Sequence, residues 1–169
     1  MDLTNLETLK QKIADMEAKL KEMKAEIERL KNGWEMKCPY KDGDEYYFVS
    51  ANGLAKYDSW GGYVFEKEAF DQGNIFKTKQ EAELESKRRN LLTRFRAFRD
   101  ECNDGWTPDW TGNSEKISLY YKPEDKKLYL NTSFIADTFN LFGYFKNKKD
   151  AERAIKLFGD EIKELFVEV

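Results

Sequence analysis

The sequence predicts an α+β protein in which an N-terminal coiled-coil helix precedes an antiparallel sheet with helices. Three observations support this class. Apolar residues before Gly33 recur at spacings of three and four, and after Gly33 short aromatic and β-branched runs alternate with turn residues. The phrase "NIFKTKQEAE" (74–83) also recurs as "GYFKNKKDAE" (143–152). We therefore expect a coiled-coil oligomerisation helix over 1–33 and an α+β domain over 34–169.

Composition narrows the class of protein. The chain has 169 residues, a formal net charge of −3 and 15% aromatic residues, and the aromatics allow a small domain to bury a real core. The dense charge of both signs gives no overall attraction to polyanions, so a nucleic-acid role would need a local basic patch. The first residues, "MDLTNLETLK", show no basic region followed by an apolar stretch, so we expect no signal peptide, and no apolar run is long enough to span a bilayer. We expect a cytoplasmic protein with no membrane partner.

Residue types that carry catalysis are scarce. There is no histidine, which removes Ser-His and Cys-His pairs and the commonest zinc ligand. Cys38 and Cys102 lack the paired spacing of a metal or redox site, and we expect two free, buried thiols in a reducing compartment. The acidic stretch "KDGDE" (41–45) is typical of a polar turn before a strand. We predict a non-enzymatic protein with no cofactor and no metal site.

The first thirty residues carry an unbroken heptad pattern. A capping-box pair, Thr4 with Glu7, opens the predicted helix, and Asn32 with Gly33 closes it. The predicted oligomerisation seam consists of Leu6, Leu9, Ile13, Met16, Leu20, Met23, Ile27 and Leu30. An isolated helix of this length is marginal in water, so something must cover the seam.

Charges beside the seam indicate how a second copy would pair. The g-to-e′ pairs of a parallel dimer are Lys12 with Glu17, Glu26 with Lys31, and Lys19 with Lys24. Two of these pairs are attractive, whereas a fully overlapped antiparallel pair sets Lys12 against Lys19 and Lys10 against Lys31. We expect self-association as a parallel coiled-coil dimer. A trimer, a grip on another protein and a helix folded back on its own domain stay open as alternatives.

The remaining chain reads as two similar units. In the first, strands at 46–50 and 54–58 flank a turn at Asn52 and Gly53. Thr78 then caps a helix, with Glu81 as its capping-box partner. That helix runs to about Cys102, and its apolar face consists of Leu84, Leu91, Phe95, Phe98 and Cys102.

The second unit repeats this order. Strands at 116–121 and 127–131 lead to a helix capped by Asn147, which Gly159 ends or kinks before a short helix or tail. Trp34 precedes the first hairpin as Trp110 precedes the second. The predicted segments are repeat one (34–102), repeat two (110–158) and a C-terminal tail (159–169). We expect both hairpins to join in one antiparallel sheet with pseudo-twofold symmetry, with Phe76 and Phe145 as equivalent core residues.

One helix holds the strongest charge cluster. The stretch "KRRNLLTRFRAFR" (87–99) has six basic and no acidic side chains. The candidate partner-binding residues on it are Arg88, Arg89, Arg94, Arg96 and Arg99. Two interpretations are open: the arginines rim a buried helix with their stems on the core edge, or they form a surface for an acidic protein or a nucleic acid.

Tryptophans provide a second set of candidates. Trp106 and Trp110 lie in the connector between the repeats, and Trp60 precedes two glycines. Each either caps the core or, if exposed, serves as a binding hot spot, because Trp and Arg dominate such sites. We include all three among the candidate partner-binding residues.

The pattern as a whole resembles a group of small accessory proteins from phages and prophages of Gram-positive bacteria. The resemblance covers 34–113 best and lies in the "GDEYYFVSANG" hairpin, the "GNIFKTKQEAE" helix start and the later "DW". It implies a non-catalytic protein of a bacterial host cell that acts as a stoichiometric inhibitor of a host defence component, such as a CRISPR-Cas effector. A nucleic-acid-binding accessory protein and a sponge for a signalling nucleotide are the alternatives.

Overall fold

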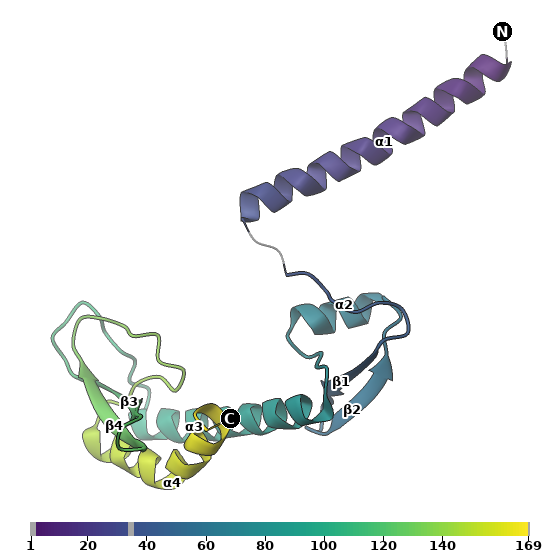
Figure 1. Ribbon diagram of the computed structural model, residues 1–169. Helices are drawn as coiled ribbons and strands as arrows, with labels where there is room; N and C mark the ends of the chain where they lie inside the picture. The colour runs from purple at the N-terminus through teal and green to yellow at the C-terminus, as the bar shows by residue number, and fades with distance from the viewer. Residues whose placement is uncertain (1–2, 34–35, 169) are drawn as a thin grey trace. The chain divides into compact units, whose positions relative to one another are not determined.

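The computed structural model describes residues 3–33 and 36–168, without the side chains of residues 3–6 and 32. The chain divides into two compact units, Met1–Lys41 and Asp42–Val169. Along the chain the elements are α1 (Leu3–Asn32), β1 (Glu45–Val49), β2 (Ala55–Ser59), α2 (Val64–Asp71), α3 (Lys79–Asn103), β3 (Lys116–Lys122), β4 (Lys127–Ser133) and α4 (Lys148–Phe166) (Figure 1). The α+β class is confirmed. Trp34, the expected entrance to the first hairpin, lies outside the described residues.

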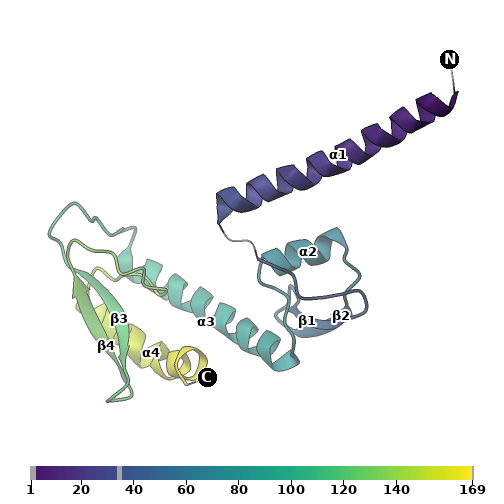
Figure 2. The same cartoon turned by 45° about the horizontal axis from the view of Figure 1, so that its top comes forward.

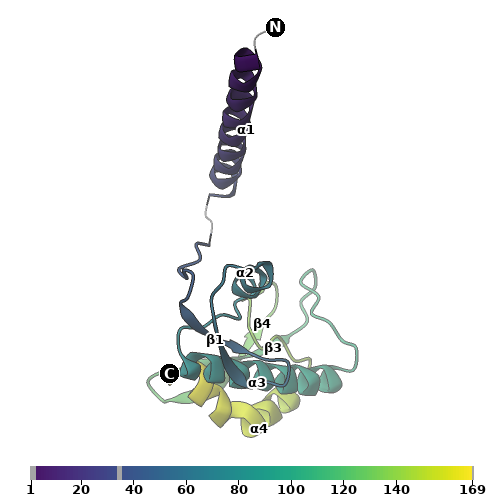
Figure 3. The same cartoon turned by 90° about the vertical axis from the view of Figure 1, so that its right-hand side faces the viewer.

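The first unit contains the predicted N-terminal helix. α1 is continuous from Leu3 to Asn32 (Figure 3). Gly33 follows it with a φ of +69°, and its N–H donates to the carbonyl oxygen of Arg29 at 3.2 Å. Glycine takes this left-handed conformation at no steric cost, so the predicted stop is confirmed. The Thr4 side chain of the predicted capping box lies outside the described residues.

The second unit begins with the predicted hairpin. β1 and β2 pair antiparallel, with Tyr47 opposite Tyr57. The turn is closed by hydrogen bonds from the Ser50 N–H to the Leu54 oxygen (2.9 Å) and from the Gly53 N–H to the Ser50 oxygen (2.8 Å). Gly53 adopts a φ of +79°. The strands and turn lie within one residue of the positions that the sequence predicted.

Helix α2 was not predicted. It has no Ser, Thr, Asp or Asn at its N-cap, which is Tyr63, so the usual start signal is missing. Glu66 replaces that signal from inside the helix, because its carboxylate accepts hydrogen bonds from the N–H groups of Tyr63 (2.7 Å) and Gly61 (3.0 Å). The stabilisation of its first turn is therefore supplied by a buried acidic side chain.

Helix α3 starts and ends where the sequence indicates. The Thr78 hydroxyl accepts a hydrogen bond from the Glu81 N–H (3.2 Å), and the Glu81 carboxylate accepts one from the Thr78 N–H (3.0 Å), which completes the predicted capping box. All five residues of the predicted apolar face lie in or against the main core. The prediction of this helix is confirmed.

The second half departs from the prediction at Gly159. α4 continues through Gly159 to Phe166, so the expected end at this residue and the separate tail are wrong, while a kink there stays a prediction. Gly159 is buried, and a side-chain carbon placed there would lie 3.5 Å from Leu128 of β4. This is an ordinary van der Waals distance, so the helix passes close to the strand here without requiring a glycine. Burial of Ile162 and Leu165 beyond the glycine carries the helix onward.

The expectation of one shared sheet is wrong. β1 pairs with β2 and β3 pairs with β4, which gives two separate two-stranded sheets. Figure 2 shows the two hairpins at opposite ends of α3. Ser86 and Arg89 bind the first hairpin and the segment that follows α2, whereas Leu91 packs in the core of the second half. Arg89 and Leu91 lie roughly 200° apart on a helix. The two hairpins therefore contact opposite faces of α3, and the helix keeps them apart.

Both copies of the recurring phrase make the same backbone contact. Phe76 exchanges two hydrogen bonds with Tyr47 (2.8 and 2.9 Å), and Phe145 exchanges two with Ile117 (2.7 and 3.0 Å). Their burial differs, since Phe145 is fully buried and Phe76 only half-buried. The prediction of equivalent core residues is therefore wrong for Phe76. An internal duplication of the whole unit stays a prediction.

The main core belongs to the second half of this unit. It consists of Leu91, Phe95, Ile117, Leu119, Phe142, Phe145, Ala151, Ala154, Phe158, Ile162 and Leu165. Phe95 lies at its centre, with its ring centroid 4.8 Å from that of Phe142 and 5.3 Å from that of Phe158. Tyr46 and Trp60 are buried separately beside the first hairpin, with ring centroids 6.0 Å apart. Each hairpin therefore has its own buried aromatic cluster.

Candidate functional site

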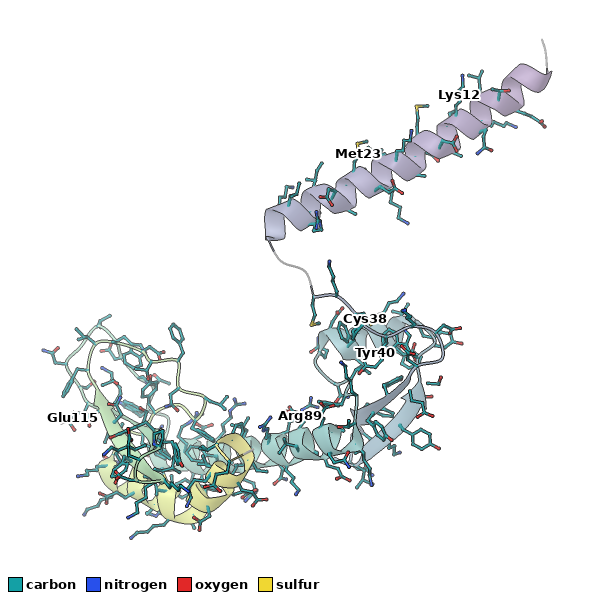
Figure 4. The ribbon with its side chains drawn as sticks, in the orientation of Figure 1. Lys12, Met23, Cys38, Tyr40, Arg89 and Glu115 are labelled. Atoms are coloured by element: carbon teal, nitrogen blue, oxygen red, sulfur yellow. The ribbon has the colours of Figure 1, made fainter. Side chains whose placement is uncertain are left out.

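The apolar seam of α1 is exposed along its whole described length. Leu9, Ile13, Met16, Leu20, Met23, Ile27 and Leu30 are between 49 and 69% exposed. The Leu6 side chain of the predicted seam lies outside the described residues. Figure 4 shows Lys12 and Met23 extending from α1. Continuous exposed apolar stripes of this kind are typical of interaction surfaces.

Charges on α1 also pair within the helix. Arg29 binds Glu26 at 2.5 Å, and Lys31 binds Glu28 at 3.2 Å, in exposed pairs three residues apart. The hydrogen bond from Arg29 lowers the pKa of Glu26. Such pairs give an isolated helix a few tenths of a kcal/mol each. Lys31 and Glu26, the predicted partners across a dimer, therefore each have an alternative partner in the same helix.

Three of the five candidate arginines are held against parts of the chain distant in sequence or against its aromatic rings. Arg88 donates to the carbonyl oxygen of Leu165 (2.7 Å), with its guanidinium 5.2 Å from the centre of the Phe166 ring. Arg94 forms an ion pair with Glu161 at 2.5 Å. Arg99 donates to the carbonyl oxygen of Phe142 (3.1 Å) and to Asp100. These three arginines link α3 to α4 and to the segment before it.

Arg89 and Arg96 lie on another face of α3. Arg89 binds Glu85 (2.8 Å), Asn74 (3.0 Å) and the carbonyl oxygen of Gly73 (3.3 Å). Arg96 is exposed, and its side chain has no hydrogen bond or ion pair with the described residues. The two are seven residues apart, or two helical turns, and so point the same way. The structure does not gather the five arginines into one patch.

The tryptophans are less exposed than a free hot spot would be. Trp60 is buried beside Tyr46, while Trp106 and Trp110 are half-buried. Trp110 packs edge-on against Tyr144, with centroids 5.0 Å apart, and the ammonium of the buried Lys116 lies 5.1 Å from its ring centre. This ammonium also donates to the carbonyl oxygen of Phe134 at 2.5 Å. Trp60 and Trp110 therefore both stabilise the fold.

Exposed aromatics occur elsewhere, at positions that the sequence did not single out. Tyr63 and Phe65 stack with an interplanar angle of 7°, and both are at least 60% exposed. Phe139 is 92% exposed in the loop after β4. No local pattern in the sequence distinguishes an exposed aromatic from a buried one.

A buried carboxylate organises the first hairpin. Glu66 is 1% exposed, and besides its backbone bonds it accepts a hydrogen bond from the Tyr46 hydroxyl at 3.5 Å. Burial first, and then the charge of Glu66, raise the pKa of Tyr46 to about 12. This pair fixes the segment between β2 and α2. The partners of the Glu66 carboxylate are all groups of the same chain, so we assign Glu66 a structural role.

Other reactive groups give no catalytic arrangement. Both cysteines are free as predicted, but Cys38 is exposed, which corrects the expectation that both are buried. Pro39 follows it in a segment without helix or strand, so no element covers the thiol. Burial raises the pKa of the half-buried Cys102 thiol. Within residues 3–33 and 36–168 there is no acidic, cysteine or histidine cluster able to hold a metal ion, and no helix long and apolar enough to cross a membrane.

Comparisons of this chain with protein-family models, with curated proteins and with solved structures find no match.

Proposed function

We propose that this protein is a non-catalytic, self-associating binding protein, in which α1 forms a parallel coiled-coil dimer and residues 42–169 carry the contact surface. The exposed seam of α1 is the observation that carries the proposal, because all seven of its described side chains lie in water within a unit of their own. Pairing with a second copy would cover them.

A second copy suits the seam because its flanking charges favour the parallel match. Two of the three charged g-to-e′ pairs are attractive. Exposed pairs contribute only about 0.3 to 0.5 kcal/mol each, so they bias orientation while burial of the seam supplies most of the stability. A dimer doubles the number of surfaces presented to a partner and raises avidity without any new contact.

The oligomer is tested by light scattering on the full chain. Leu20→Lys places a charge in the middle of the seam, while Ala18→Lys makes a matched change on the outer face of α1. We expect two chains per particle for the unmodified protein and for A18K, and one chain for L20K. A single chain per particle in the unmodified protein over a wide concentration range would overturn the proposal.

The partner that we propose for residues 42–169 is a bacterial defence protein, such as a CRISPR-Cas effector, on the strength of the resemblance to phage accessory proteins. A strain with an active CRISPR-Cas system rejects a targeted plasmid. Expression of the full chain should restore transformation, and L20K should restore it less if avidity matters. Unchanged rejection alongside a dimeric particle would contradict this choice of partner and leave the dimer standing.

The nucleic-acid alternative has less support from the geometry. Arg88, Arg94 and Arg99 direct their guanidinium groups to oxygens of the same chain. A surface that tracks phosphates needs several free cations along one face.

A further inference from the structure

A small aromatic pocket lies between the β1–β2 hairpin and α2, which Figure 2 shows beside each other. The pocket has a volume of about 90 Å³, and its lining consists of Tyr46, Phe48, Asp58, Phe65, Ala69, Asn74 and Ile75. Pockets for whole small molecules usually have volumes of about 300 Å³ or more, so this one has room for a single chemical group. Three of the lining side chains are aromatic and one is a carboxylate.

The strand register and the helical repeat bring these side chains together. Tyr46 lies directly opposite Asp58 in the hairpin, so both side chains are on the same face. Phe48, two residues after Tyr46, shares this face, and the two ring centroids are 6.1 Å apart. Phe65 and Ala69 are about one helical turn apart and share a face of α2. The pocket lies where the two faces meet.

Most polar groups that line the pocket have partners within the chain. The Tyr46 hydroxyl donates to Glu66 at 3.5 Å, and the Asn74 amide exchanges two hydrogen bonds with the backbone of β1 (3.0 and 3.3 Å). The Asp58 Oδ1 accepts from the Ser59 N–H at 2.8 Å, whereas its Oδ2 makes no hydrogen bond or ion pair with the described residues. One carboxylate oxygen therefore remains for a ligand.

The charges around the pocket favour a cation. Burial, and then the negative charges of Glu66 and Asp58, raise the pKa of Tyr46, so both carboxylates act on this ring. The faces of aromatic rings are themselves negative and attract cations. Lys56 lies opposite Phe48, but it is exposed, does not line the pocket and forms no ion pair with Asp58 among the described residues. An anion is therefore disfavoured here.

We infer that this pocket binds a quaternary ammonium group, in which a positively charged nitrogen carries three methyl groups. Such a group has no N–H, so it needs no hydrogen-bond acceptor, and its methyl groups can pack against the rings. A lysine ammonium has three donors and a guanidinium has five, more than the free oxygen of Asp58 can satisfy. Choline and the trimethylated lysine of a protein both carry the group. This inference is independent of the α1 dimer.

Nuclear magnetic resonance of the ¹⁵N-labelled full chain tests this inference. Choline is titrated while the backbone signals of Phe48, Asp58 and Ala69 are followed, and these signals should shift together with one dissociation constant. The control ligand is 3,3-dimethyl-1-butanol, which has the shape of choline with a neutral carbon in place of the nitrogen. It should bind about tenfold more weakly. Equal affinity would overturn the inference, because it would show a pocket that selects only apolar shape.

A second titration with the amide of N-acetyl-trimethyllysine separates the two sources of the group. Tighter binding than that of choline would identify a trimethylated protein as the source, and weaker binding would identify a free small molecule. No shift with either compound would overturn the inference.

Three variants locate the site. Asp58→Asn removes the charge yet keeps the oxygen that accepts from Ser59, so it should weaken choline binding about threefold to fivefold and leave the neutral alcohol unaffected. Phe65→Leu keeps an apolar side chain at a position that is 60% exposed and should also weaken choline binding. Asp71→Asn removes a charge at the exposed end of α2, outside the pocket, and should change nothing. Equal effects of D58N and D71N would contradict a site at this pocket.

Discussion

The side-chain amide of Asn103 donates a hydrogen bond of 2.8 Å to the carbonyl oxygen of Tyr144. Its oxygen accepts a second bond from the Lys146 N–H at 3.0 Å, so one buried side chain at the end of α3 binds both neighbours of Phe145. Phe145 in turn is bridged to Ile117 of β3. The end of α3, the second hairpin and the start of α4 are thereby fixed at a single corner.

Replacement of Asn103 by alanine should therefore destabilise the second half. The change leaves the buried carbonyl oxygen of Tyr144 and the part-buried N–H of Lys146 without their partner, which costs about 1 to 3 kcal/mol in the free energy of unfolding. Urea unfolding followed by far-ultraviolet circular dichroism measures this loss. Asn113→Ala, at an exposed position, is the control and should cost less than about 0.5 kcal/mol. Equal midpoints for N103A and the unmodified chain would contradict the role of this corner.

Tyr46 predicts a loss of stability at alkaline pH. Its pKa is raised to about 12, while an unfolded tyrosine titrates near 10. The folded state therefore holds this proton more tightly, and its contribution is complete below about pH 10 and disappears as the pH rises toward 12. The expected loss is on the order of 2 kcal/mol. It should show as a difference between the unmodified chain and Tyr46→Phe, because the other tyrosines titrate in both.

As the pH rises through this window, the unmodified chain should lose its advantage over Tyr46→Phe and then become the less stable of the two. Tyr46→Phe keeps the buried ring and removes the hydroxyl that donates to Glu66 at 3.5 Å, so it should fold at neutral pH. Parallel stability curves from pH 9 to pH 12 would show that Tyr46 titrates as it does in the unfolded chain.

Phe139 predicts a stabilising substitution. It adopts a φ of +51°, in the left-handed region that a bulky side chain rarely occupies, and its ring is exposed. Phe139→Gly removes this strain at little cost in buried area and should add about 0.5 to 1 kcal/mol to the free energy of unfolding. Thermal unfolding checks the sign. Ala136→Gly in the same loop is the control and should be neutral or destabilising, since Ala136 has no positive φ.

Local signals in the sequence predicted most elements of this fold. Heptad spacing and Gly33 predicted the extent of α1. The three-residue spacing of Thr78 and Glu81, which form a capping box, predicted the start of α3. These signals work because partners a few residues apart meet in any tertiary context. The same spacing could not show whether the α1 seam is covered, because an apolar stripe reads the same in a sequence whether it is covered or exposed.

The single-sheet prediction failed because α3 buries two faces of different chemistry. The apolar face of α3 could be predicted from the spacing of its hydrophobic residues. The face against the first hairpin makes its contacts through Ser86 and Arg89, which are residue types usually exposed to solvent. Helix α2 was missed for a similar reason, since Glu66 acts from within the helix. Polar contacts between distant segments leave no periodic trace in a sequence.

Cys38 provides a native reporter of how two copies of α1 align. It is exposed and lies eight residues beyond Leu30, the last residue of the seam. In a parallel dimer both copies of Cys38 lie at the same end of the coiled coil, whereas an antiparallel dimer separates them by the helix length, roughly 45 Å for thirty residues. Disulfide formation needs the two Cα atoms within about 7 Å. Mild oxidation should therefore link two chains only in the parallel form.

Electrophoresis without reductant measures the linked fraction. Cys102→Ser should cross-link as well as the unmodified chain, Cys38→Ser should not cross-link at all, and Leu20→Lys should lower the yield in Cys102→Ser by disrupting the seam. A dimer by light scattering that gives no Cys38 cross-link, with either oxidant or a short bis-maleimide, would establish the antiparallel arrangement. The balance of charges at Lys12, Lys19 and Lys31 would then be too small to set orientation, and packing of Met16 and Met23 would decide it instead.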